Sequence, residues 1–250
     1  MTTDLTLVVT AHDETSVCGP TMRSADLAVT AAREAGYTVQ TVIGLDRASH
    51  ATTSYFRQSR FDHWERWEYD EGDLGRVRNA MLPRTDGRLI AFLDADDLFS
   101  ENWLVDAIGV LDAAAERGDR AIAHPELNMV FDGARSVLVN IPDDSPLFSP
   151  HYLYVRHCYD SLCMAPRQAH LDIPYVSRDV PNGLSYQDFQ FTIESLDQGW
   201  RHVVVPDTII FKRRRDYSLV VESNNRRSIV RSLPEMAIDQ VRDLPHPGSD

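Results

Sequence analysis

Short apolar runs alternate with helical patterns along the first half of this 250-residue chain, and this alternation restricts the fold more than any other feature. Residues 5–10, 38–45 and 88–93 are β-branched or apolar stretches typical of buried strands. Residues 24–35 place alanines and a leucine on one helical stripe, and residues 101–117 form a longer helical pattern. Strands that alternate with helices predict an α/β fold in which a mainly parallel sheet is covered by helices on both faces.

Residues that favour helix ends mark the boundaries of these predicted helices. Gly36 and Gly118 stand where C-terminal caps are expected, and Ser100 is predicted to be the N-cap of the helix over 101–117. A further short helix is predicted over residues 74–81. The boundaries therefore agree with the alternating pattern.

The second half of the chain is less regular. Residues 129–131 and 137–139 flank an Asp-Gly pair, which predicts a small antiparallel hairpin. Residues 142–185 are rich in proline and polar turns, and residues 187–196 have a helical pattern. Two short strands are predicted at 203–205 and 208–211, on either side of Pro206. We expect one domain over residues 1–250.

Composition narrows the possible partners and compartments. The chain has 38 acidic and 25 basic residues, and a net charge of −13 argues against a nucleic-acid partner. Lys212 is the only lysine, which we attribute to compositional bias. Three cysteines, Cys18, Cys158 and Cys163, form no disulfide framework and fit a reducing compartment. Without a signal peptide or a long apolar segment, we expect a cytoplasmic protein with no transmembrane segment.

A pair of carboxylates follows the third predicted strand. Asp94 and Asp96 are two residues apart, so in an extended segment their side chains point to the same side. Ligands of open α/β sheets bind beyond the carboxyl ends of the strands, where this pair lies. Adjacent carboxylates repel unless a cation lies between them, and a hard ion such as Mn²⁺ or Mg²⁺ prefers oxygen ligands. The alternative is an acidic turn that caps the next helix.

Acidic residues also follow the first two predicted strands. His12 and Glu14 come just after the first strand, and Asp46 ends the second. In a parallel sheet these ends lie at one edge, so the acids should converge with Asp94 and Asp96. Core packing does not require such convergence, whereas a nucleotide offers hydroxyl and N–H donors to carboxylates. Each acid taken alone is typical of a turn.

The sequence resembles the family-2 glycosyltransferases of the GT-A fold. The resemblance extends over about residues 5–220 and is most specific between residues 72 and 104. The matching segments are Thr10-Ala11-His12-Asp13-Glu14, Asp46-Arg47-Ala48-Ser49, Gly72-Asp73-Leu74-Gly75, Arg78-Asn79, Phe92-Leu93-Asp94-Ala95-Asp96-Asp97, Trp103-Leu104, Tyr186-Gln187-Asp188 and residues 213–218.

The resemblance implies a GT-A-like nucleotide-binding sandwich and a nucleotide-sugar donor, most commonly a UDP-sugar. It assigns residues 1–98 to donor binding, 99–220 to the acceptor and 221–250 to a tail. Asp96 would be the main ligand of a Mn²⁺ or Mg²⁺ ion, together with Asp94. The residues implied in donor binding are Ala11, His12 and Glu14 near the nucleoside, Asp46 at the base, Asp94 and Ala95 near the ribose, and Arg78, Arg213 and Arg215 near the diphosphate.

By the same resemblance, Asp188 would be the general base that deprotonates the acceptor hydroxyl of a glycan, a lipid-linked or a small-molecule acceptor. One base and direct displacement imply inversion at the anomeric carbon. A bare N-cap is the alternative for an Asp at a helix start. Two departures stand out, because the family usually has Glu where Gln187 stands and often a His within the segment 212–215. That basic segment is interpreted as closing over the diphosphate, and alternatively as attracting anionic lipid in a peripheral membrane contact.

Two other functions remain open. A haloacid-dehalogenase-type phosphatase also has an Asp-x-Asp after a strand, but Leu98 stands where it expects Thr or Val, and Lys212 is the only candidate for its catalytic lysine. A non-catalytic protein of the same fold, binding a nucleotide or glycan, would keep the same acids.

Overall fold

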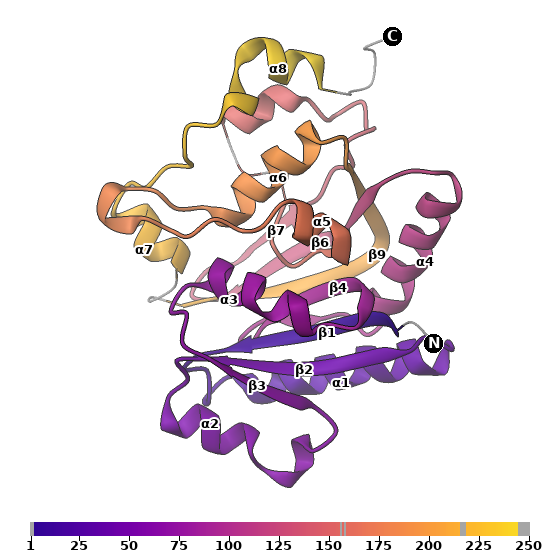
Figure 1. The fold of residues 1–250 in the computed structure, drawn as a ribbon, viewed down its shortest axis with the longest axis vertical. Coiled ribbons are helices and arrows are strands. Elements are labelled where there is room, and N and C mark those ends of the chain that lie inside the picture. Colours follow the sequence, from indigo (N-terminus) through magenta and orange to yellow (C-terminus); the bar gives the residue numbers. More distant parts are fainter. Residues whose placement is uncertain (1–2, 156, 158, 216–218, 245–250) are drawn as a thin grey trace.

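The computed structural model describes residues 3–155, 157, 159–215 and 219–244 (Figure 1). Cys158, and positions 216–218 at the end of the last matching segment, lie outside the described residues. Within the described residues, no helix is both long and apolar enough to cross a membrane.

A single mixed sheet unites the described strands, in the order β3-β2-β1-β4-β8-β6-β9-β5, with β7 beside β6. The first four strands in this order are parallel, and β6 and β9 are parallel to each other. The short β8 is antiparallel to β4 and to β6, so all the long strands end at the same edge. The strands are β1 (Thr3–Ala11), β2 (Val39–Asp46), β3 (Glu65–Tyr69), β4 (Gly87–Asp94), β5 (Leu98–Phe99), β6 (Ala121–Asp132), β7 (Ser136–Val139), β8 (Met164–Pro166) and β9 (Arg201–Arg214).

Helices cover both faces of this sheet (Figure 1). Leu7 and Val9 of β1 pack against α1 and α4, whereas Val8 packs in the second core cluster with α3, α5 and α6. Because β1 is buried on both faces, it reads as a continuous apolar run. The helices are α1 (Cys18–Glu34), α2 (His50–Phe56), α3 (Leu74–Met81), α4 (Trp103–Glu116), α5 (Arg167–Asp172), α6 (Gln187–Asp197), α7 (Leu219–Asn225) and α8 (Ile238–Asp243).

The predicted strands at 5–10, 38–45 and 88–93, the helix over 74–81 and the hairpin are confirmed, the hairpin with Met129 opposite Val137. The first helix begins at Cys18, not at residue 24. Pro20 does not prevent this earlier start, because it lies in the first turn, where the missing N–H of proline costs no intrahelical hydrogen bond. Ser100 is not the N-cap of α4, which is Asn102. Its hydroxyl instead accepts a hydrogen bond from the Ile209 N–H at 3.0 Å, tying β9 to this loop.

The two strands predicted around Pro206 are one strand, β9. The pairing of β9 with β6 shifts register between Pro125 and Leu127, and Asp207 has a φ of 59°. Such a bulge leaves a residue outside the ladder, so the missing N–H of proline costs little there. The Asp207 N–H donates to Glu126 Oε2 at 2.7 Å, which closes the irregularity.

Candidate functional site

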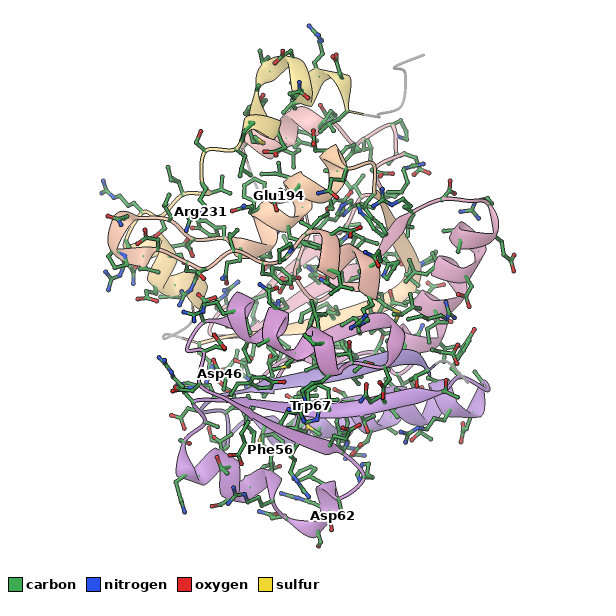
Figure 2. The ribbon with its side chains drawn as sticks, in the orientation of Figure 1. Asp46, Phe56, Asp62, Trp67, Glu194 and Arg231 are labelled. Carbon is green, nitrogen blue, oxygen red and sulfur yellow. The ribbon has the colours of Figure 1, made fainter. Side chains whose placement is uncertain are left out.

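Acidic side chains gather where the parallel strands end, as the sequence predicts. Thr10 of β1 lies opposite Asp94 of β4, and Ala11 lies opposite Leu45, so Asp46 follows beside His12. The Nδ1 atom of His12 is 2.8 Å from the Asp46 carbonyl oxygen. Figure 2 shows Asp46 at this edge of the sheet. We call this edge, with Glu14, Asp46, Asp94, Asp96 and Asp97, the acidic rim.

Asp94 is held by two donors from the protein. Its Oδ1 atom accepts hydrogen bonds from the Thr10 hydroxyl and from Nη2 of Arg78, each at 2.9 Å. Burial opposes the charge of Arg78, whose side chain is 2% exposed, but Asp94 and the weaker effects of other neighbours together raise the Arg78 pKa. The guanidinium also lies 5.0 Å from the ring centre of Phe92. Arg78 therefore orients Asp94, and a direct contact with a diphosphate stays a prediction.

Replacing Arg78 should destabilise the fold, because it leaves Asp94 without its cation. We expect Arg78→Met to lower the free energy of unfolding by about 3 kcal/mol, the low end for breaking a buried pair, since Asp94 is 24% exposed. Arg76→Met is the matched control on the same helix, because that side chain is 55% exposed in its pair with Glu71 and should lose less than about 1 kcal/mol. Urea unfolding measures both; equal losses would contradict this role of Arg78.

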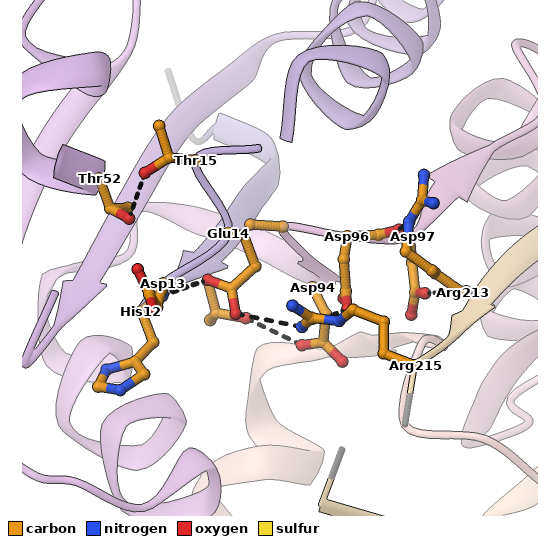
Figure 3. A network of polar contacts seen from close by, with 12 residues as sticks. His12, Asp13, Glu14, Thr15, Thr52, Asp94, Asp96, Asp97, Arg213 and Arg215 are labelled. Carbon is orange, nitrogen blue, oxygen red and sulfur yellow. Dashed lines mark hydrogen bonds and ion pairs between the residues drawn. The ribbon is translucent and has the colours of Figure 1, made fainter. Parts of the chain in front are cut away.

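The guanidinium of Arg215, just after β9, contacts the carboxylates of both Asp96 and Glu14 (Figure 3). Nη2 of Arg215 lies 2.6 Å from Asp96 Oδ2 and 3.4 Å from Glu14 Oε1. Burial and the neighbouring Asp94 raise the pKa of Asp96, although Arg215 acts against this rise. The site thus combines the neighbouring carboxylates of Asp94 and Asp96 with the guanidinium of Arg215, which bridges Asp96 to the carboxylate of Glu14.

Glu14 also shapes the loop after β1. Its Oε2 atom accepts the backbone N–H groups of His12 at 2.6 Å and Asp13 at 2.9 Å. The small side chains of Ala11 and Ala95 pack in the core, 4% and 1% exposed. Any contact of these two alanines with a ligand would therefore come mainly from their backbone atoms.

Asp46 holds a neighbouring loop in the same way. Its carboxylate accepts the N–H of Glu71 at 2.8 Å and the N–H of Gly72 at 2.9 Å. Gly72 has a φ of 65°, a conformation that favours glycine. The carboxylate thus fixes the loop that leads into α3, and its contact with a base stays a prediction.

Arg213 is hydrogen-bonded to the acidic rim through its backbone N–H and its side chain. Its N–H donates to Asp97 Oδ1 at 2.7 Å, its Nε to the Asp96 carbonyl at 3.3 Å, and its Nη1 to Asp132 at 2.7 Å. Asp97 is a further residue of this site that was not predicted from the sequence. It is 2% exposed, and burial raises its pKa to about 7 against the effect of Lys212. Its place beside Asp94 and Asp96, at the end of the matching segment 92–97, was the signal that could have found it.

Asp188 lies in the first turn of α6, as predicted. The N-cap residue is Tyr186, with a φ of 64° and no capping side chain, so Asp188 is not the N-cap. Its Oδ2 atom is 3.6 Å from Nδ1 of His157, whose ring stacks on Phe189.

Gln187, the residue before Asp188, has a structural role. The Gln187 amide donates to Asp73 Oδ1 at 2.7 Å and to the Val176 carbonyl. Gln187 thereby ties the start of α6 to the N-cap of α3.

The four tryptophans are packing residues, at most 4% exposed: Trp64, Trp67, Trp103 and Trp200.

The donor set of the acidic rim fits a hard divalent cation that shares its ligands with phosphate. Among the residues that the structure describes, no three His, Cys, Asp or Glu side chains converge as a ready metal cage. Mg²⁺, however, is usually held by one or two carboxylates, with substrate phosphates and water as further ligands. Asp94 and Asp96 provide that pair. Burial and then the charge of Asp94 raise the pKa of Asp96, and a cation beside the two carboxylates would offset both effects.

No protein-family model and no curated protein matches the sequence. The structure resembles solved structures, among them S. aureus TarS 1–349 in complex with UDP-GlcNAc, with a TM-score of 0.64 and 15% identity over 86% of this chain. It also resembles GalNAc-T7 with UDP, GalNAc and Mn²⁺, with a TM-score of 0.58 and 14% identity over 86% of this chain. The chain spans 60% of the TarS 1–349 chain and 44% of the GalNAc-T7 chain. These likenesses confirm the expected GT-A-like α/β fold.

Proposed function

We propose that this protein is a glycosyltransferase that moves a sugar from a nucleotide-diphosphate donor, a UDP-sugar, to an acceptor hydroxyl with inversion. The observation that carries the proposal is the contact of Arg213 and Arg215 with Asp96, next to Asp94, at the carboxyl edge of a GT-A-like sheet. The fold is shared with proteins whose structures hold UDP-GlcNAc or UDP with Mn²⁺.

In this proposal, residues 1–98 bind the donor and residues 99–220 the acceptor. Asp46, His12 and Glu14 line the end of the sheet where the nucleoside would lie, with the backbone of Ala11 and Ala95 beneath it. Arg213 and Arg215 offer guanidinium groups, which suit bidentate contact with a diphosphate. Arg78 orients Asp94 from below.

Cleavage of the bond between the sugar and the diphosphate leaves extra negative charge on the leaving nucleotide. Asp94 and Asp96 would hold Mn²⁺ or Mg²⁺, which when bound neutralises that charge. Arg215 would leave Asp96 and turn to the diphosphate, because one carboxylate oxygen cannot bind the metal ion and the guanidinium equally well at the same time. Asp188, in the first turn of α6, would accept the proton of the acceptor hydroxyl as that hydroxyl attacks.

A thermal-shift panel of nucleoside diphosphates, each with and without Mn²⁺, tests donor binding. UDP at about 100 times its Kd should stabilise the fold by about 2.7 kcal/mol, which raises Tm by about 5–10 °C for a chain of this size. Uridine alone should give a much smaller shift, because it lacks the diphosphate. If no nucleoside diphosphate raised Tm with Mn²⁺ present, the proposed function would be wrong.

A further inference from the structure

Lys212 has a defined environment that compositional bias does not explain. It is the only lysine in a chain with 24 arginines, because lysine and arginine total 25. Its ammonium lies between two carboxylates, 3.0 Å from Asp160 Oδ1 and 3.2 Å from Asp97 Oδ2. Burial would raise the pKa of Asp160, but Lys212, the Leu162 N–H and His157 together lower it. The three charges form a largely buried ionic cluster, which we call the lysine clamp.

The geometry of the clamp explains why lysine stands here. An ammonium is a compact charge with three donors at the end of a flexible stem, so it can divide its hydrogen bonds between two carboxylates. A guanidinium is a wide planar fork, and the Asp97 side chain is only 3% exposed, so there is little room for extra atoms beside it. In a chain that otherwise uses arginine for every basic residue, this position favours the smaller charged group.

The clamp acts on the acidic rim through Asp97. While Oδ2 of Asp97 contacts Lys212, its Oδ1 accepts the Arg213 N–H at 2.7 Å. The N–H of Asp97 in turn donates to the Asp94 carbonyl at 2.9 Å, which closes the turn that carries Asp96. The end of β9 is therefore fixed against the turn of the acidic rim, and from that end Arg215 reaches Asp96 at 2.6 Å.

Asp160 anchors the clamp on its other side. Its Oδ1 atom also accepts the Leu162 N–H at 3.0 Å, so the loop before β8 is joined to β9. Asp160 has no contact with the turn that carries Asp96 among those of the described residues. It contributes to the stability of the cluster, whereas the path from Lys212 to the acidic rim runs through Asp97.

We propose that Lys212 is a positioning residue of the donor site, which holds Asp97 and thereby sets the place of Arg213 and Arg215 over Asp96. This proposal rests on the proposed function and adds to it a residue that contacts neither donor nor cation. It also separates Lys212 from the catalytic lysine of a phosphatase, because the ammonium contacts Asp97 and Asp160 instead of Asp94.

Two variants separate positioning from stability. Lys212→Met should weaken UDP binding in the presence of Mn²⁺ by about tenfold, as is typical when a residue that orients a ligating group is lost. Asp160→Asn is the matched control: it removes the other partner of the same ammonium and lowers Tm, but should change the Kd of UDP less than about twofold. Isothermal titration calorimetry measures both Kd values. Equal weakening in the two folded variants, or none in Lys212→Met, would overturn the proposal.

The single lysine also gives a direct readout in the unaltered protein, should Lys212→Met not fold. Protein labelled with ε-¹³C-lysine has one lysine signal, and saturating UDP with Mg²⁺ should shift it, because Arg213 and Arg215 move against the donor. A lysine with a purely structural role would keep its signal unchanged, which would overturn the positioning role alone. Absence of UDP binding in the calorimeter would instead overturn the proposed function, and this proposal with it.

Discussion

Asp188→Asn is expected to lower the turnover of sugar transfer by about 10²–10⁴-fold while leaving the affinity for UDP unchanged. Asparagine has the shape of aspartate but cannot accept the proton that the acceptor hydroxyl loses. Asp188 lies in the first turn of α6 and its Oδ2 atom faces His157, so the substitution leaves the acidic rim intact. Turnover with a UDP-sugar donor and the Kd of UDP are the two measurements.

The matched control for this variant is Asp197→Asn, which removes a carboxylate from the exposed end of the same helix. It should retain full turnover. If Asp188→Asn turned over as fast as the unaltered protein, Asp188 would have no part in the mechanism. A protein that binds UDP tightly but transfers no sugar, even before substitution, would instead be the non-catalytic binder that the sequence leaves open.

Asp96→Asn is expected to lower kcat/KM by about 10–100-fold or more and to abolish the effect of Mn²⁺ on UDP binding. The substitution halves the carboxylate pair that would hold the cation and also removes the partner of Arg215 at 2.6 Å. EDTA should produce a similar loss in the unaltered protein and little further loss in the variant. Titrating UDP with and without Mn²⁺ measures this coupling.

Asp86→Asn is the control for Asp96, because Asp86 is exposed and lies before the opposite end of β4. It changes the net charge by the same amount without touching the acidic rim, so general electrostatics would affect both variants equally. Transfer that EDTA leaves unchanged would show that Asp94 and Asp96 serve the site without a metal.

The acidic rim could be predicted because it follows from local rules. An apolar run ended by Asp predicts both a strand and the edge at which its carboxylate lies, so the placing of Asp46 and Asp94 at one edge needs only the parallel pairing of β2 and β4 with β1. Helix α3 was equally readable, because Asp73 caps it through the Arg76 N–H at 3.0 Å. In these cases, residues that are close together in the sequence decide where the strand or helix begins or ends.

The lysine clamp could not be predicted, because its members are far apart in the chain. Asp160 and Lys212 are separated by 52 residues, and only the pairing of β9 with β6 and of β6 with β8 brings these segments together. Pro206 led to the wrong prediction of two strands in place of β9 for a related reason. A proline interrupts the hydrogen bonds of a strand unless that strand bulges away from its partner, as β9 does at residues 206–208, and the pairing with β6 is not apparent from the local sequence.

The bridge from Arg215 to Asp96 and Glu14 has a thermodynamic consequence in the proposed function. A cation that takes Asp96 frees the guanidinium for phosphate, and a nucleotide that takes the guanidinium frees Asp96 for the cation. Each ligand thus removes the competitor of the other, and linkage requires that the two affinities rise by the same factor. Arg215 would make the two ligands cooperative without any change in the shape of the sheet.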